Sequence, residues 1–567
     1  MTVAENYDFV VVGAGSAGCV VANRLSESGK FRVLLLEAGG RDSNPWIHIP
    51  LGTGKVFNNP RLNWRYESEP EPALGGRVLY QPRGKVLGGT GSINGMIYCR
   101  GNRSDYDQWH ALGLTGWRYE DVLPFFRKAE DQQRGEDRYH GVGGPLSVSG
   151  PASRHPLADA FIASAAELGI AMNADFNGAT QDGAGYFQYT IKGGRRSSPA
   201  TAYLRPARAR ANLDVVTEAL VHRVMFDGTR ASGVDVAVGG VRRNVRANRE
   251  VVLCAGTFNS PQLLQLSGIG PAEVLQRLGI PVVRHCADVG ENYQDHFGVR
   301  MAYLCTEPVT LNDIVGSRWR SALMAIRYAL SRSGPMAAPG LPAGCFVRSS
   351  EDLDAPDIEL VLSLWTMVQG ERNKARMIDP YSAFGLVVED LHPAGRGRVR
   401  LKNPDPTVAP EIFCNLFSTE RDERAIVYAI RLARRIFAAS ALARYRGVEL
   451  LPGPSVQTDA QIVDYVRRNG FGLYHPVGTC AMGPDPDAVL DARLRVRGLA
   501  GLRVVDASIM PTITSGNINA TVGMIGEKGA AMIVEDAAIA RPWTTSVDGL
   551  RERRRRRRFT GEWPRLA

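Results

Sequence analysis

The chain has 567 residues, of which 44% are hydrophobic and 22% are charged, a composition that excludes fibrous and wholly disordered proteins. This length is too great for a single ordinary core and predicts at least two domains. The net charge of +10 is concentrated near the carboxyl end, where residues 551–558 hold seven arginines and one glutamate, so the mildly basic remainder argues against a nucleic-acid partner.

The first predicted elements are a strand, a helix and a second strand. Residues 7–12 and 31–36 are short apolar runs, and residues 16–28 between them place apolar side chains on one face at helical spacing. The turn before this helix has the spacing G-x-G-x-x-G, and Glu37 follows its last glycine by 19 positions, at the end of the second strand. A carboxylate there binds the hydroxyls of an adenosine ribose and disfavours a 2′-phosphate, so the pattern predicts FAD or NAD rather than NADP.

Residues 84–95 are dense in glycine and small hydroxyl residues. Backbone without bulky side chains can approach a flat ligand closely and offer it N–H donors. Farther along the chain, residues 251–256 form a third apolar run. Residues 256–270 then predict a strand end, a helix that starts at Ser260 and Pro261, and a glycine stop.

Residues 301–460 are assigned mainly to a second domain. Within them, residues 357–364 and 396–401 have strand character, and residues 420–438 are predicted to be helical. Near the carboxyl end, residues 502–506 form a fourth apolar run. Because the apolar runs are far apart in the sequence, a nucleotide-binding domain built from them must be assembled discontinuously.

Three segments together resemble the glucose-methanol-choline (GMC) oxidoreductases: the glycine fingerprint, residues 84–107 and residues 256–270. The resemblance covers residues 6–535, and its motifs are highly specific as a set. Residues 92–98 and 290–296 are most similar to the choline dehydrogenase and bacterial alcohol dehydrogenase branch. It implies an α/β fold, in which a Rossmann-like FAD-binding domain is joined by an α+β substrate-binding cap domain with an antiparallel sheet.

The expected domains follow this division. Residues 1–300 are assigned to FAD binding, with some cap segments, and residues 301–460 mainly to the cap. Residues 461–540 return to the FAD domain with the catalytic residues. Residues 541–567 are expected to be a disordered, arginine-rich tail.

Residues 474–480 contain His475, the last histidine of the chain. Oxidising an alcohol by hydride removal requires its hydroxyl proton to leave at about the same time, and a group that titrates near neutrality is a suitable acceptor. By resemblance, His475 is the catalytic histidine, and Asn517 stands where family members place histidine or asparagine. His475 is therefore expected to take the proton and Asn517 to hydrogen-bond the alcohol oxygen, with hydride passing to flavin N5.

Cofactor-binding residues are expected in every block of the resemblance. Ile93 stands where some members attach FAD through a histidine, so the FAD is expected to be non-covalent. The helix after Asn517 is expected to be capped by Asn517 or Asn519 and to direct its positive end at the flavin. The expected cofactor-binding set is Gly13, Gly15, Ser16, Ala17, Gly18, Glu37, Ala38, Val86, Gly89, Asn94, Gly95, Met96, Val221, Ala255, Gly256, Asp506, Ala507, Asn517 and Asn519.

That last helix also carries Gly523, Gly526 and Gly529, one glycine at every third position. Glycine has no side chain, so this repeat predicts close approach of the helix to neighbouring backbone.

The predicted activity is the FAD-dependent oxidation of an accessible alcohol, a CH–OH donor, to an aldehyde or ketone. The sequence has no second G-x-G-x-x-G for a nicotinamide cofactor, which indicates that the organic substrate itself reduces the flavin. A quinone-like acceptor or oxygen would then take the electrons. The alternatives are a GMC-fold lyase or photodecarboxylase, and a non-catalytic flavin-binding scaffold that works through its arginine tail.

The identity of the alcohol stays open. Choline would need acidic and aromatic groups around its cation, and Glu359, Trp365 and Glu371 lie in the expected cap without a placement over the flavin. The other histidines form no i, i+4 pair with metal-ligand spacing, and His296 in the 290–296 motif is expected to be structural. We therefore predict no metal.

Other sequence features favour a cytoplasmic protein. The eight cysteines form no C-x-x-C pair and are expected to be small buried residues in a reducing compartment. No apolar run approaches the ~18 residues of a membrane span, and few residues precede the first predicted strand. Peripheral membrane contact through the arginine run and the oligomeric state are left open.

Overall fold

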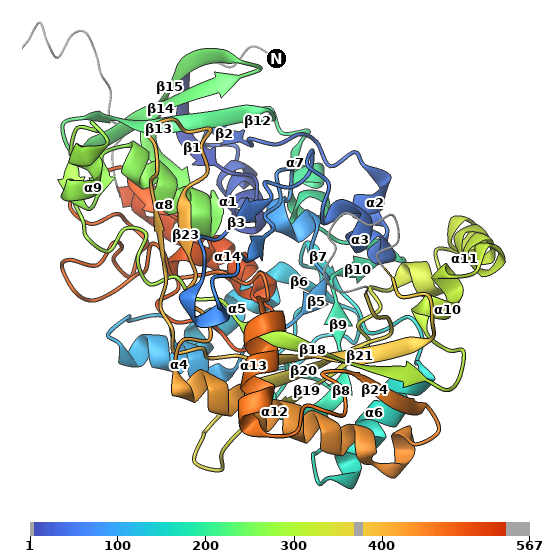
Figure 1. Ribbon diagram of the computed structural model, residues 1–567. Coiled ribbons are helices and arrows are strands. Elements are labelled where there is room, and N and C mark those ends of the chain that lie inside the picture. The colour runs from blue at the N-terminus through green and yellow to red at the C-terminus, as the bar shows by residue number, and fades with distance from the viewer. Residues whose placement is uncertain (1–4, 368–377, 540–567) are drawn as a thin grey trace, which may run out of the picture.

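Two seven-stranded sheets lie at opposite ends of the molecule (Figure 1). The structure is a computed structural model that describes residues 5–367 and 378–539. The first sheet takes strands from both ends of the chain, which confirms the predicted discontinuous, Rossmann-like assembly. Its parallel strands are β12 (Leu213–Val216), β2 (Val33–Leu36), β1 (Asn6–Val12), β15 (Val241–Leu253) and β26 (Leu502–Val504), and β14 (Arg230–Val238) and β13 (Ala219–Asp227) extend it antiparallel.

The glycine fingerprint lies in the turn between β1 and helix α1 (Ser16–Glu27), as predicted. Gly13 donates its N–H to the carbonyl of Leu36 at 2.8 Å, and Glu37 follows β2 directly. Parallel strands end at the same edge of a sheet. The fingerprint and Glu37 therefore lie together at that edge.

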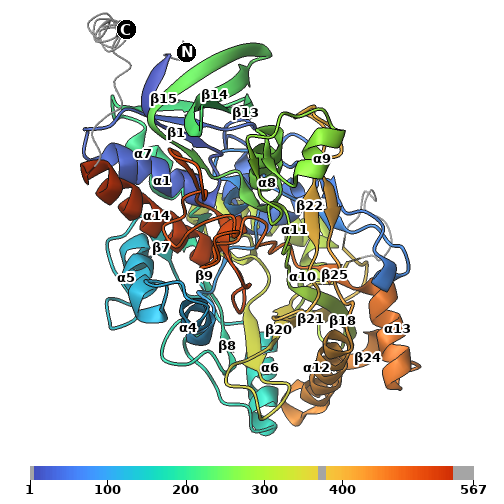
Figure 2. The same ribbon diagram turned by 90° about the vertical axis from the view of Figure 1, so that its left-hand side faces the viewer.

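Helix α14 (Asn519–Ile539) lies alongside α1 (Figures 1 and 2). A Cβ at Gly526 would come within 3.1 Å of the Ala17 carbonyl oxygen, so the predicted close approach to backbone is confirmed there, whereas a Cβ at Gly529 would meet a Val505 side-chain methyl at 2.7 Å. The prediction is wrong for Gly523, where an added Cβ would meet no atom within 4 Å. A three-residue step turns a helix by about 300°, so successive glycines drift around its axis instead of sharing one face.

Helix α8 (Gly256–Leu266) begins earlier than predicted. The predicted start at Ser260 and Pro261 is wrong, because Pro261 lies inside the helix. Proline has no N–H to donate to the carbonyl of Thr257. The hydroxyl of Thr479 donates to that carbonyl at 2.6 Å instead, a replacement from a distant segment that the local sequence does not reveal.

The second sheet, here called the cap sheet, is antiparallel throughout, which confirms the expected cap architecture. Helix α12 (Glu420–Ala438), predicted with these bounds, packs its apolar face on the sheet together with α6 (Pro156–Glu167) and α13 (Asp459–Asn469). The strands, in spatial order, are β24 (Arg446–Leu451), β18 (Phe297–Cys305), β21 (Ala383–Asp390), β20 (Ile358–Ser363), β19 (Ala343–Val347) and β8 (Gly183–Tyr186), and β25 (Phe471–Gly472) also pairs with β18.

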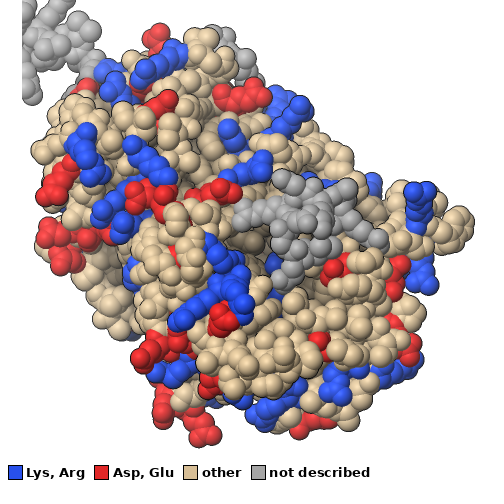
Figure 3. All heavy atoms as spheres, viewed as in Figure 1, with Lys and Arg blue, Asp and Glu red and all other residues tan. Residues whose placement is uncertain are grey.

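The remaining sequence expectations concern thiols, charge and the membrane. All eight cysteines are free thiols; seven are buried, as expected, and Cys305 is partly exposed. On the face drawn in Figure 3, basic and acidic side chains are interspersed. No helix within residues 5–367 and 378–539 combines the length and apolar character needed to cross a membrane. The predicted tail at 541–567 lies outside the described residues, and the predicted domain boundaries stay predictions.

Candidate active site

A cavity of about 420 Å³ is lined by residues of both sheets. Two of the predicted residues do not line it. Gly18 packs against the first sheet, where a Cβ would lie 3.1 Å from Cys254 Cβ, and Val86 is buried in a small apolar cluster. The predicted residues that do line it are Gly13, Gly15, Ser16, Ala17, Glu37, Ala38, Gly89, Asn94, Gly95, Met96, Val221, Ala255, Gly256, His475, Asp506, Ala507, Asn517 and Asn519.

At one end of the cavity, Glu37 is held by backbone donors. Its carboxylate accepts hydrogen bonds from the N–H of Ala14 at 2.9 Å and of Gly39 at 2.8 Å. Burial outweighs these hydrogen bonds and raises the pKa of Glu37 to about 7. Each carboxylate oxygen keeps a lone pair for a further donor, such as a ribose hydroxyl.

The glycine-rich segment lies directly against the fingerprint. A Cβ at Gly89 would come within 2.7 Å of Gly15 Cα, so any larger residue would separate the two segments. On the other side, the hydroxyl of Ser16 donates to Asn519 Oδ1 at 2.7 Å and joins the amino ends of α1 and α14. Two helix amino ends and a side-chain-free backbone wall form a cradle that fits the pyrophosphate of an extended dinucleotide.

Asp506 connects the end of β26 to the start of α8. Its Oδ2 accepts from the N–H of Gly256 at 2.8 Å and from the hydroxyl of Ser260 at 2.6 Å, and its Oδ1 accepts from Ser508. Although Asp506 lines the cavity, its described hydrogen bonds are therefore to the protein itself, which anchors the α8 turn against the first sheet.

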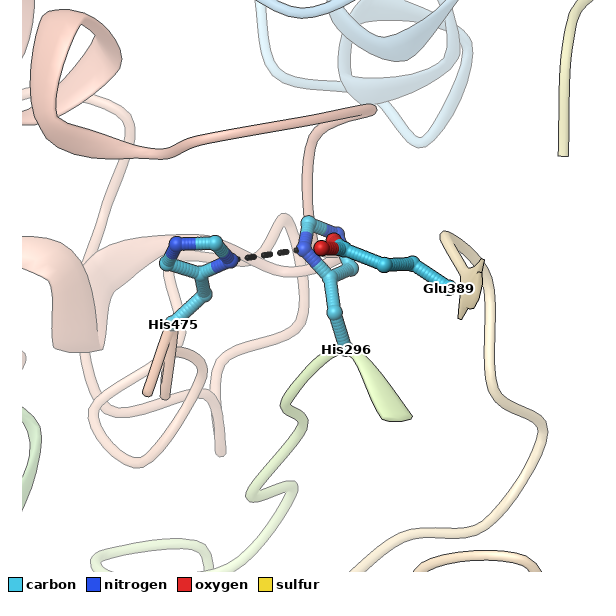
Figure 4. A group of neighbouring side chains, drawn as sticks. All are labelled: His296, Glu389 and His475. Carbon is cyan, nitrogen blue, oxygen red and sulfur yellow. Dashed lines mark hydrogen bonds between the residues drawn. The ribbon is translucent and has the colours of Figure 1, made fainter. Parts of the chain in front are cut away.

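At the other end of the cavity, His475 contacts His296 (Figure 4) and, through its other ring nitrogen, Asn517. The Nδ1 atoms of the two histidines are 3.0 Å apart, His296 Nε2 is 3.1 Å from the carbonyl oxygen of Thr514, and Asn517 Nδ2 is 3.2 Å from His475 Nε2. The structure thus brings His475 and Asn517 side by side in the cavity, as the sequence predicted. The contact between His475 and His296 was missed, because His296 was interpreted from the sequence as structural.

These contacts select one tautomer of His475. Burial and the charge of Arg83 lower the pKa of His475 to about 3, and burial lowers that of His296 well below its usual range, so both rings are neutral. A carbonyl oxygen can only accept, so His296 Nε2 carries its hydrogen and His296 Nδ1 must accept from His475 Nδ1. His475 Nε2 is then left unprotonated and accepts from the amide of Asn517.

The amide of Asn517 has a second, unused atom. Its Oδ1 is buried and has no hydrogen-bond partner among the described residues. Burying an amide oxygen without a donor costs free energy. Its position in the cavity therefore fits a ligand that brings a donor to it.

Two buried carboxyl groups lie on the cap sheet, Glu359, which the sequence placed in the cap, and Glu389, which sequence reasoning missed. Glu389 on β21 lines the cavity, and Glu359 is its cross-strand partner on β20. Burial raises the pKa of Glu359 to about 8, and burial together with the neighbouring Glu359 raises that of Glu389 well above its usual range. Only strand pairing brings them together, and the one signal in the sequence is an acidic residue inside an apolar strand.

Both carboxyl groups have oxygens without partners. Neither oxygen of Glu359 nor Oε2 of Glu389 has a hydrogen-bond partner within residues 5–367 and 378–539. Glu389 also lies beside the histidines, with one ligand atom from each of Glu389, His296 and His475 within 4.8 Å of one another (Figure 4). Such a trio could hold a metal ion; the absence of a metal stays a prediction.

The cap also contributes rings and a cation to the cavity. Trp365 lines it, whereas Glu359 lies behind Glu389 and Glu371 falls outside the described residues. Arg300, which sequence reasoning did not single out, also lines it and places its guanidinium 4.3 Å from the centre of the Phe471 ring. The cap side of the cavity therefore combines apolar walls with charges of both signs.

The Glu359→Gln variant is expected to melt at a higher temperature than the parent at about pH 8.5, with little difference at about pH 5. A carboxyl group whose pKa rises from its ordinary 4.5 to about 8 on folding binds more protons in the folded state, so stability falls as pH rises through that window. Glutamine cannot ionise, so the variant does not lose stability over this pH range. Thermal unfolding over a pH series measures it, and parallel pH profiles for the two proteins would contradict it.

Known proteins of related sequence oxidise alcohols. The chain is 43% identical over 538 residues to the mitochondrial choline dehydrogenase of Mus musculus, covering 93% of this chain and 89% of that protein. It is 42% identical over 535 residues to the oxygen-dependent choline dehydrogenase of Vibrio vulnificus, covering 94% of each. Among solved structures, pyridoxine 4-oxidase from Mesorbium loti has a TM-score of 0.84 at 33% identity, covering 94% of this chain and 99% of that one. A formate oxidase has a TM-score of 0.89 at 26% identity, covering 95% and 100%.

The fold, the cavity and these relatives together define an FAD-dependent oxidoreductase that acts on the CH–OH group of alcohols. The GMC oxidoreductase models match residues 7–298 and 393–526, and the chain belongs to the GMC oxidoreductase family, as the resemblance implied. These relatives give no support to a lyase, a photodecarboxylase or a non-catalytic scaffold. Because the mouse relative is described as mitochondrial, the cytoplasmic location stays a prediction.

Acid or heat denaturation is expected to release the FAD into the supernatant. Ile93 lines the cavity at the position where some family members carry a linking histidine, and its aliphatic side chain has no atom that could bond covalently to a flavin. Absorbance of the supernatant and of the redissolved pellet measures the distribution. Flavin that stays with the precipitated protein would contradict the prediction.

Proposed function

We propose that His475 accepts the hydroxyl proton of a primary alcohol whose oxygen is held by Asn517. The observation that carries the proposal is the hydrogen-bond chain from the carbonyl of Thr514 through His296 to His475, which supports an unprotonated Nε2 beside Asn517. Because the pKa of His475 is depressed to about 3, this base is neutral throughout the physiological range. Bound FAD supplies the hydride acceptor.

The residues proposed to hold FAD are those that line the nucleotide end of the cavity. The glycine fingerprint and the amino ends of α1 and α14 offer backbone N–H groups to the pyrophosphate. Glu37 would accept from the ribose hydroxyls. Residues 89 and 94–96 also line the cavity and would help to hold the cofactor, and Asp506 keeps the α8 turn in place.

We propose His296 as a positioning residue that keeps the hydrogen of His475 on Nδ1. The His296→Ala variant is expected to lower the rate of substrate oxidation about tenfold, because His475 can then expose either nitrogen to the alcohol. The carbonyl oxygen of glutamine can also accept from Nδ1, so His296→Gln should restore most of the rate. A glutamine variant as slow as the alanine variant, with both folded and loaded with FAD, would reject the positioning role.

We further propose that the substrate is a primary alcohol with a cationic nitrogen, of which choline is the first to test. The unpartnered Oε2 of Glu389, which lines the cavity, supports this, because a cation beside it would favour the ionised form of the carboxyl group. Trp365 offers a ring face of the kind that binds quaternary ammonium groups. The choline dehydrogenases at 42 to 43% identity agree with this substrate class.

The test is anaerobic reduction of the enzyme by a panel of alcohols, followed by the absorbance of the flavin band at about 450 nm. The panel contains choline, its uncharged isostere 3,3-dimethylbutan-1-ol, and benzylic alcohols. Bleaching by choline far faster than by its isostere is the expected result. Equal rates would reject the cationic substrate and leave alcohol oxidation standing, whereas a panel in which nothing bleaches the band would reject the proposed reaction itself.

The electron acceptor is proposed to be a quinone or oxygen. Relatives described as an oxygen-dependent dehydrogenase and as an oxidase support oxygen, and a quinone is the alternative to test. Oxygen consumption and quinone reduction, measured side by side with the best alcohol, distinguish the two.

A further inference from the structure

Helix α11 (Arg318–Ser331) stands out from the body of the protein with its apolar side chains in solvent. It follows the short helix α10 (Leu311–Val315) and protrudes at the right edge of the molecule (Figure 1). Trp319 is 71% exposed, Leu323 48%, Ile326 55% and Leu330 84%. Large apolar side chains exposed together in this way mark an interaction surface.

The four exposed side chains form one stripe. At about 100° per residue they fall within about 60° of arc around the helix. The opposite side carries Tyr328, which is buried against Met336 and Ala337 and donates its hydroxyl to the carbonyl of Gly194 at 3.0 Å. The helix is thus anchored by its back, and the protein's own core does not account for the apolar stripe on its front.

Basic residues border the stripe. Arg318 and Arg320 lie about 100° to either side of Trp319, and Arg327 lies about 80° from it. All three are exposed, and none pairs with a carboxylate of the described residues. Residues 314–334 contain four arginines and no acidic residue. An apolar stripe with long cationic side chains along its borders is the arrangement of helices that lie in a membrane interface, where the arginines reach anionic headgroups.

A second copy of this chain is a poorer occupant of the stripe. A two-fold contact through α11 would bring together two segments that carry four arginines each and no acidic residue. Like charges in contact oppose association. An anionic lipid surface instead matches both the apolar stripe and the charge that borders it.

The helix is connected to the wall of the active-site cavity at both of its ends. On the preceding α10, the side chain of Asn312 accepts from the N–H of Thr366 at 3.1 Å and donates to its hydroxyl at 3.2 Å. After α11, the chain passes through residues 335–337 to Leu341. Thr366 and Leu341 both line the cavity. The segments on both sides of α11 are therefore linked to the wall of the cavity.

We infer that α11 docks this enzyme on an anionic lipid bilayer, with Trp319, Leu323, Ile326 and Leu330 in the interface and the flanking arginines on lipid headgroups. The inference rests on the α11 surface and is independent of the choice of substrate.

The experiment is co-sedimentation of the full-length, FAD-loaded protein with vesicles of phosphatidylcholine alone and of phosphatidylcholine mixed with phosphatidylglycerol. The parent should bind the mixed vesicles, and added salt should weaken the binding. Replacing the four stripe residues together by serine should lower binding at least about tenfold. Replacing Met172 and Val448 by serine is the matched control, because these apolar residues are 73% and 61% exposed elsewhere on the surface.

Two further measurements separate the stripe from other causes. A chain without residues 551–567 should still lose binding when the stripe is replaced, which distinguishes the stripe from the arginine tail. FAD content and turnover with a soluble dye acceptor should be unchanged in the stripe variant. Vesicle binding by the stripe variant equal to that of the parent would overturn the inference. The inference would also be overturned if the parent does not bind vesicles and is a dimer, and if the stripe variant is a monomer.

Discussion

Replacing His475 with alanine is expected to lower the rate of flavin reduction by the best alcohol by about 10²-fold or more, with FAD still bound. His475 Nε2 is the unprotonated atom beside Asn517, so the variant has no neutral base at the position proposed for the alcohol hydroxyl. The residues that line the nucleotide end of the cavity are unchanged, which is why the cofactor should remain. Anaerobic stopped-flow reduction and the flavin-to-protein absorbance ratio measure the two quantities.

The pH dependence of flavin reduction in the parent protein is a second test of the role of His475. Because the pKa of His475 is lowered to about 3, the parent should show no loss of this base between about pH 5 and pH 8. His48→Ala is the matched control, since His48 is largely buried and does not line the cavity. A His475→Ala variant that reduces its flavin as fast as the control would remove His475 from the mechanism.

Glu389→Gln is expected to lower kcat/KM for choline by about 10²-fold and to leave that for 3,3-dimethylbutan-1-ol nearly unchanged. The substitution keeps the shape of the side chain and removes the negative charge that a bound cation would favour on Glu389. A cationic substrate loses the attraction of that charge, whereas its uncharged isostere has none to lose. Steady-state kinetics of parent and variant with both alcohols measure the difference.

The conservative Glu389→Asp variant is the companion to this measurement. Aspartate keeps an ionisable carboxyl group but its side chain is shorter by one methylene. The loss of kcat/KM for choline should therefore be smaller than in Glu389→Gln. An equal loss for choline and for the isostere in Glu389→Gln would assign Glu389 to the architecture of the site instead of to recognition of a cation. The proposed roles of His475 and Asn517 would not be affected by that outcome.

The sequence was sufficient for those features that short stretches of chain encode. The G-x-G-x-x-G turn and Glu37 predicted a dinucleotide site because both depend on one local strand, helix and strand unit. The bounds of α12 followed from its helical periodicity. The resemblance to the GMC oxidoreductases, which the family models confirm, added FAD and alcohol oxidation to that local pattern.

The tertiary structure decided which groups meet in the cavity. Glu389 and Glu359 are neighbours through strand pairing, and His296 reaches His475 across a large interval of sequence, so no local pattern could connect them. The prediction of where α8 starts was wrong for the same reason. The hydroxyl that replaces the missing N–H of Pro261 comes from Thr479, which is distant in the sequence. Hydrogen bonds, burial and charge act through space, and the tautomer of His475, the raised pKa values of the two glutamates and the solvent-facing stripe of α11 exist only once the chain is folded.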